Sequence, residues 1–171
     1  MGFKSWETPP DFFKALDDEF HFTLDAAASH DNHLCERYCT IDGTFSALRE
    51  HDYNINSLSK LDGLTYPWIG ERVFCNPPYD NSLGAWVDKA LSYEAEVAVL
   101  LLPPSVDTAW FHRLCADPSW GATRTYADHN WVGMCDRDHD VIFMEGRLRF
   151  WRDGKPGDSP RAGNLLAVIR G

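Results

Sequence analysis

The sequence predicts an α/β fold with a mostly parallel sheet, flanking helices and a C-terminal antiparallel hairpin. Six consecutive apolar residues at 97–102 are typical of a central parallel strand that is covered on both faces. Apolar residues at helical spacing within 83–91 precede this strand, and a short apolar strand at 73–75 precedes the helix, which together indicate a β-α-β unit. Three later apolar segments, separated by glycines, predict the antiparallel part; they lie at 141–144, 148–151 and 165–169.

The N-terminal part of the chain predicts a helix followed by a strand. Pro9-Pro10-Asp11 is a helix start, and the apolar residues of 12–20 then recur at helical spacing. Residues 21–24 are predicted as a strand that ends at Asp25. The remaining expected elements are a short helix at 34–38, long connections with at most one short strand at 40–70, and a helix at 108–114.

Length and composition fit one soluble domain, predicted to span 1–171. No apolar segment approaches the roughly 20 residues that cross a membrane, and the N-terminus lacks the apolar core of a signal peptide, so we expect no membrane association and a cytoplasmic location. Five cysteines without a C-x-x-C pair argue against a disulfide framework. Two His and two Cys lie within 30–39, but their spacing matches no common zinc finger, so we expect no metal site.

Charge is distributed unevenly along the chain. The net charge of -10 argues against a general nucleic-acid binder. Residues 146–171 nevertheless contain six Lys and Arg against two Asp, a local net charge of +4. This basic end is compatible with phosphate contacts, and on charge alone it is equally compatible with a solvated hairpin.

The segment Val73-Phe74-Cys75-Asn76-Pro77-Pro78-Tyr79-Asp80 joins a buried strand to a rigid polar turn. A planar amino group, such as N6 of adenine, has a delocalised lone pair, and two acceptors that receive both of its N–H groups would free that lone pair for reaction. The Asn76 side-chain oxygen and the Pro77 carbonyl are candidate acceptors, and the double proline with Pro78 restricts the backbone that carries them. Tyr79 offers a face on which a base can stack. The simpler alternative is an ordinary strand end.

Asp25 and Asn76 each follow a predicted strand. Ligands of open α/β sheets bind beyond the carboxyl ends of the strands. We therefore expect both side chains in one crevice if their strands are neighbours.

Several short motifs occur in a fixed order along nearly the whole chain. They are Trp6-Glu7-Thr8-Pro9, Leu24-Asp25-Ala26-Ala27-Ala28, Asp62-Gly63-Leu64 with Trp68, Asn76-Pro77-Pro78-Tyr79 with Trp86-Val87, Leu102-Pro103 with Asp107-Thr108, and Gly146-Arg147-Leu148-Arg149-Phe150. In these motifs the sequence resembles the phage-type DNA N6-adenine methyltransferases. That resemblance implies a Rossmann-like methyltransferase fold and dependence on S-adenosylmethionine.

The resemblance also implies roles for particular residues. Asn76, Pro77, Pro78 and Tyr79 would form the catalytic motif. The residues that would line the cofactor cleft are Trp6, Thr8, Pro9, Asp25, Ala26, Ala27, Asp62, Gly63 and Asn76. Simpler roles remain open, since Asp25 can cap a helix, Trp6 can be a surface aromatic and Asp62-Gly63 can be a plain turn. The G-x-G of many methyltransferases is absent, and alanines at 26–28 stand in its place.

The substrate implied by the resemblance is an adenine flipped out of DNA and methylated at N6. Predicted DNA contacts are Arg147, Arg149, Arg152 and Lys155, and 104–145 is a candidate small target-recognition segment. Two alternatives stay open: a different planar amine, in RNA adenine or a protein glutamine amide, or a non-catalytic cofactor-binding interaction protein. A phage origin would place the protein in the cytoplasm of a bacterial host cell. No feature of the sequence specifies an oligomeric state.

Overall fold

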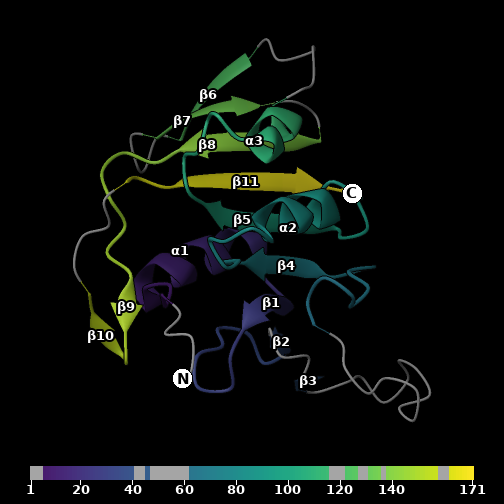
Figure 1. Ribbon diagram of the computed structural model, residues 1–171, viewed down its shortest axis with the longest axis vertical. Coiled ribbons are helices and arrows are strands. Elements are labelled where there is room, and N and C mark those ends of the chain that lie inside the picture. Colours follow the sequence, from purple (N-terminus) through teal and green to yellow (C-terminus); the bar gives the residue numbers. More distant parts are fainter. Residues whose placement is uncertain are drawn as a thin grey trace.

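The computed structural model describes residues 6–40, 45–46, 62–115, 122–126, 131–135, 138–157 and 162–171 (Figure 1). Three helices and eleven strands lie within these residues. In chain order they are α1 (Pro10–Phe20), β1 (Leu24–Ala28), β2 (Tyr38–Thr40), β3 (Phe45–Ser46), β4 (Arg72–Cys75), α2 (Leu83–Ala90), β5 (Val97–Leu102), α3 (Ala109–Leu114), β6 (Ala122–Tyr126), β7 (Trp131–Cys135), β8 (His139–Phe143), β9 (Trp151–Arg152), β10 (Lys155–Pro156) and β11 (Leu165–Arg170).

One sheet organises the described part of the chain. This sheet has nine described strands, in the order β3-β2-β1-β4-β5-β11-β8-β7-β6. Strand β1 pairs in parallel with β2 and β4, and β4 pairs in parallel with β5. Strand β11 then runs antiparallel between β5 and β8, and β7 and β6 continue antiparallel beyond β8. The predicted Rossmann-like α/β class is confirmed: β2, β1, β4 and β5 form the parallel part, the short β3 pairs antiparallel with β2 at its outer edge, and the other antiparallel strands follow β5.

Strand β5 is buried on both faces, as its unbroken apolar sequence predicts. Val97, Val99 and Leu101 pack in the cluster that contains the buried face of α1. Ala98, Leu100 and Leu102 pack in the cluster that contains α2 and α3. The helices therefore cover opposite faces of the sheet, with α2 and α3 on one side (Figure 1).

The predicted C-terminal hairpin is present as β9 and β10, which form a separate two-stranded sheet in the described structure; Trp151 of β9 also makes an isolated antiparallel bridge with Glu7. Asp153 and Gly154 form its turn with φ of 52° and 70°. Positive φ at both central residues is the pattern of a tight hairpin turn, and Asp-Gly is a favoured pair there. We call this element the 151–156 hairpin; it lies beside the beginning of α1 (Figure 1).

Two predictions for the N-terminal half were wrong in detail. Residues 34–37 form bends and lead into β2 instead of a helix, because the Asp25 backbone N–H bonds the Arg37 carbonyl at 3.0 Å and holds this segment alongside β1. Strand β1 also starts later than predicted and continues through Ala28, so Asp25 lies inside it. Cys35 and Cys39 are both buried.

The segment 104–145 is described in part. It contains α3 and strands β6, β7 and β8, which extend the antiparallel half of the main sheet. Residues 116–121, 127–130 and 136–137 lie outside the described residues. Target recognition by this segment, and the assignment of 1–171 as one domain, remain predictions. No described helix is long and apolar enough to cross a membrane.

Gly63 provides a test of how the 62–65 turn packs on the sheet. A Cβ built on Gly63 would lie 1.9 Å from the Ala26 carbonyl oxygen, so Gly63→Ala must push the turn away from β1. We expect a loss of about 1–3 kcal/mol in the free energy of unfolding, measured by urea denaturation. Gly84→Ala in α2 is the matched control. Its Cβ would lie 3.4 Å from the end of the Arg113 side chain and 3.7 Å from Trp110 Cβ, an ordinary contact distance, so it should cause no loss. Equal effects of the two substitutions would contradict the close packing of Gly63.

Candidate active site

Strand β4 ends at the double proline. Its last residue is the buried Cys75, after which Pro77 and Pro78 have no N–H to continue a strand ladder. Because β4 is parallel to both β1 and β5, the carboxyl ends of the three strands meet at one edge of the sheet. Asn76 and Tyr79 therefore stand at the edge where ligands of α/β sheets bind.

The Asn76 amide is oriented by the N-terminal segment 6–8. Its Nδ2 donates to the Trp6 carbonyl at 3.2 Å and to Thr8 Oγ1 at 3.1 Å. An amide nitrogen has two N–H groups, so these bonds use both of them. Asn76 Oδ1 makes no hydrogen bond to the part of the chain that the structure describes. The amide thus directs an acceptor away from the segment that holds it.

Tyr79 is fixed at its hydroxyl and exposed along its ring. The hydroxyl donates to the Leu101 carbonyl at 3.2 Å and accepts from Asn164 Nδ2 at 3.2 Å. Burial raises the pKa of this hydroxyl above its usual value, and the Asn164 hydrogen bond partly opposes that shift. The residue as a whole is still 44% exposed. The Phe150 and Tyr79 rings also lie edge to face, with centroids 6.4 Å apart. The ring is held in place while surface remains for stacking.

Asn164 was missed by the sequence analysis. It immediately precedes β11 and is buried at the level where that strand meets the end of β5. Its Oδ1 is buried without a hydrogen-bond partner among the described residues, so its polar side chain is retained at a cost in desolvation. A single Asn before an apolar strand carries no sequence signal for this contact, because the partner, Tyr79, lies 85 residues away.

Asp25 is a buried carboxyl group within β1. Its oxygens accept from the backbone N–H of Leu34 at 3.1 Å and of Ala27 at 3.4 Å. Burial raises the pKa of Asp25 to about 6, although these two hydrogen bonds and His33 partly oppose the shift. The bonds to Leu34 and Ala27 tie the loop after β1 to the strand.

The Asp62-Gly63 turn lies against β1. Gly63 packs on the Ala26 carbonyl, and the buried Trp68 indole donates to the Gly63 carbonyl at 3.0 Å. Asp62 Oδ1 accepts from the backbone N–H of Leu64 and Thr65 at 3.1 and 2.9 Å. Asp62 Oδ2 makes no hydrogen bond to the described residues. It is therefore an acceptor beside the small residues of β1.

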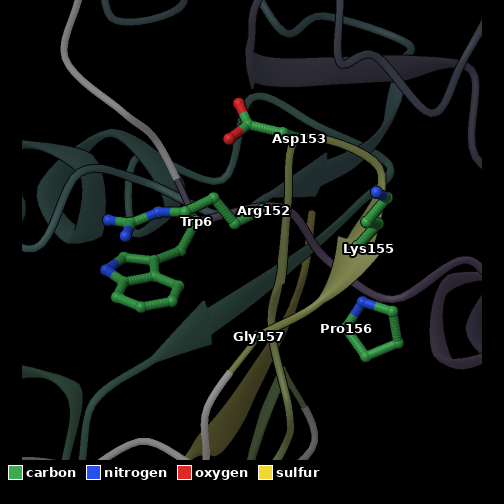
Figure 2. A pocket seen from close by; sticks show the side chains of 6 residues that line it. All are labelled: Trp6, Arg152, Asp153, Lys155, Pro156 and Gly157. Carbon is green, nitrogen blue, oxygen red and sulfur yellow. The ribbon is translucent and has the colours of Figure 1, made fainter.

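The 151–156 hairpin and Trp6 enclose an open hollow of about 410 Å³ (Figure 2). The Arg152 guanidinium lies 4.7 Å from the centre of the Trp6 ring, a cation–π contact. The lining residues are Trp6, Arg152, Asp153, Lys155, Pro156 and Gly157. Of the predicted DNA contacts, Arg152 and Lys155 thus share one hollow, whereas Arg147 and Arg149 are exposed but do not line it.

The His and Cys residues of 30–39 are occupied in packing. His33 stacks on Tyr38 with ring centroids 4.1 Å apart, and His30 Nδ1 lies 2.9 Å from the Tyr38 hydroxyl. The described residues contain no group of three potential metal ligands.

A Rossmann-like sheet with Asn-Pro-Pro-Tyr at the end of a parallel strand is the arrangement expected of an amino-methyltransferase. The family model of DNA N-6-adenine-methyltransferases (Dam) matches residues 4–119, and the chain belongs to this family. It is also 26% identical, over 175 residues, to the DNA N-6-adenine-methyltransferase of Escherichia phage T1. That alignment covers 96% of this chain and 62% of the phage protein, so the chain spans less than two thirds of its relative. The resemblance noted in the sequence is confirmed.

Asp25 predicts a pH dependence of stability. Its folded pKa of about 6 lies above the ordinary value of 3.8, so between these values the unfolded chain binds fewer protons and stability falls as pH rises. Asn cannot ionise, so its stability lacks this pH dependence. The free energy of unfolding of Asp25→Asn, relative to wild type, should therefore rise by about 2 kcal/mol from about pH 4.5 to about pH 7.5. Urea denaturation of both proteins at the two pH values measures this difference. A difference that does not change with pH would show that Asp25 ionises normally in the folded protein.

Proposed function

We propose that this protein transfers a methyl group from S-adenosylmethionine to the N6 amino group of adenine in DNA. The observation that carries the proposal is the Asn76 amide, whose nitrogen is bound by segment 6–8 while its oxygen is left as an acceptor. Membership in the adenine-methyltransferase family supports the reaction, and the phage T1 relative supports a phage origin and action in a bacterial host cell.

The residues at the ends of β1 and β4 fit a cofactor of this kind. Asp62 Oδ2 is available to accept a hydrogen bond from a hydroxyl group, such as those of a ribose. Ala27 is small and half-buried, which leaves room for close approach to the β1 backbone, while Asp25 fixes the following loop. Ala26 is buried in the core, so it would support the cleft from below. Trp6 and Thr8 bound the other side of Asn76, and Pro9 follows them at the start of α1. When bound, S-adenosylmethionine supplies an electrophilic methyl group on a positively charged sulfur.

The protein's own contribution is to orient and polarise the target amine. Asn76 Oδ1 and the Pro77 carbonyl would each accept one N–H of the target amine, which favours a tetrahedral nitrogen with an available lone pair. Asn76 is neutral and acts by orientation and polarisation, so positioning and electrostatics carry the rate. The Tyr79 ring would stack on the flipped base, a contact worth about 1–3 kcal/mol.

DNA would reach this site across the 151–156 hairpin. Arg152 and Lys155 line the hollow beside Trp6, and segment 6–8 joins this hollow to Asn76. Arg147 and Arg149 are exposed on the chain that leads into the hairpin. With the rest of the protein strongly acidic, these basic residues are the best candidates for phosphate contacts.

Substitution of Asn76 tests the reaction. Asn76→Ala removes one of two acceptors, and removal of one preorganised hydrogen-bonding group costs about 3 kcal/mol in the transition state, or roughly 100-fold in rate. We expect that loss in single-turnover transfer of labelled methyl to DNA, with S-adenosylmethionine affinity unchanged by calorimetry. Transfer near the wild-type rate would reduce the Asn-Pro-Pro-Tyr segment to a strand end. Wild-type protein that labels RNA or a glutamine peptide but not DNA would assign a different planar amine.

Neutralisation of the basic residues tests the DNA path. Changing Arg149, Arg152 and Lys155 to Gln should weaken DNA binding and lower the salt dependence by about one unit of slope per lost phosphate contact. The measurement is the dissociation constant by fluorescence anisotropy over a series of salt concentrations. Lys14→Gln on α1 is the matched control, because it removes an exposed charge that belongs neither to the hairpin nor to the lining of the hollow. The same slope in the triple variant and the control would place the DNA elsewhere.

A further inference from the structure

Glu7 lies between the 151–156 hairpin and the candidate catalytic amide, and the roles implied by the resemblance do not include it. Its carboxylate accepts from the backbone N–H of Asp153 at 3.0 Å and of Gly154 at 3.2 Å. Its own backbone N–H and carbonyl pair with Trp151 at 2.9 and 2.8 Å. Four hydrogen bonds therefore join this one residue to the base and the tip of the hairpin.

The two neighbours of Glu7 hold Asn76. Trp6 contributes its carbonyl and Thr8 its hydroxyl, and Thr8 is buried. In an extended segment adjacent side chains point to opposite sides. This alternation lets Glu7 bind the hairpin while Thr8 binds Asn76.

We infer that Glu7 is a positioning residue, which acts through segment 6–8 to orient the Asn76 amide; the inference rests on the proposed function. Without the carboxylate, the Asp153 and Gly154 N–H groups lose their acceptor and segment 6–8 is less firmly held on the hairpin. The Trp6 carbonyl and Thr8 hydroxyl then orient Asn76 Oδ1 less well toward the amine. A misplacement of about 1 Å at a reacting group can cost 10²-fold in rate. Because Arg152 belongs to the same hairpin, DNA bound there stabilises the arrangement that orients Asn76.

The first test separates chemistry from binding. We expect Glu7→Ala to lower the single-turnover rate at saturating S-adenosylmethionine and DNA by about 10-fold or more, with dissociation constants for both within about 3-fold of wild type. Glu7→Gln keeps one acceptor oxygen, so its single-turnover rate should lie between those of wild type and Glu7→Ala. Glu19→Ala, which truncates an exposed glutamate on α1, is the control and should match wild type. A wild-type rate in Glu7→Ala, or a loss confined to DNA affinity, would overturn the inference. So would a rate that falls only as far as the folded fraction measured by circular dichroism.

A double-mutant cycle tests the route through Thr8. Thr8→Val removes an acceptor of Asn76 at nearly constant side-chain volume. If Glu7 acts through segment 6–8, the Glu7→Ala and Thr8→Val losses should overlap, so that the double variant loses less than the product of the two single losses. Losses that multiply would show that Glu7 acts independently of this route.

A spectroscopic test does not depend on activity. The side-chain NH₂ resonance of Asn76 can be assigned by its disappearance in Asn76→Ala, in a protein of 19.5 kDa. Hydrogen exchange of this group should be slow in wild type and faster in Glu7→Ala, while Glu19→Ala leaves it unchanged. Unchanged exchange in Glu7→Ala would overturn the inference. If wild-type protein transfers no methyl group to DNA, the proposed function fails, and this measurement still decides whether Glu7 orients Asn76.

Discussion

The parallel pairing of β4 between β1 and β5 is the constraint on which the site depends. All three strands carry fully buried side chains, and β5 is covered on both faces, so a shift of register would expose apolar residues or bury polar ones. The pairing places Asp25 opposite Phe74 and Cys75 opposite Leu100. The double proline then ends β4 beside the ends of its neighbours. The backbone at Asn76 is therefore positioned by the core and not by the loop that follows.

A fixed backbone leaves the Asn76 side chain free to rotate, and here a second level of structure acts. Segment 6–8 binds the amide nitrogen on one side and the 151–156 hairpin on the other. Tyr79 shows the same division, because its position comes from the turn after β4 while its hydroxyl is held by Leu101 and Asn164. In both cases the sheet supplies the location, and residues distant in sequence supply the orientation.

The sequence predicted what local patterns determine. The β-α-β unit, the burial of β5 and the hairpin follow from apolar periodicity and from the glycines that separate the later apolar segments. The helix expected at 34–38 was wrong because long-range hydrogen bonds from Asp25 hold that segment beside β1. Glu7 and Asn164 were missed for a related reason, since their roles depend on partners 147 and 85 residues away. Residue type and local spacing do not predict such long-range contacts.

The surroundings of residue 76 explain why an amide suits this chain better than a carboxylate. The Trp6 carbonyl is an acceptor only, so it requires a donor from its partner. A carboxylate at position 76 would turn an oxygen toward that carbonyl, lose the hydrogen bond and bring two acceptors into contact. Asn76 satisfies the carbonyl with its nitrogen and keeps its oxygen for the substrate. The amide nitrogen thus fixes the side chain, while the amide oxygen would bind the target amine. The identity of the residue at the end of β4 is thus determined as much by segment 6–8 as by the chemistry of the target amine.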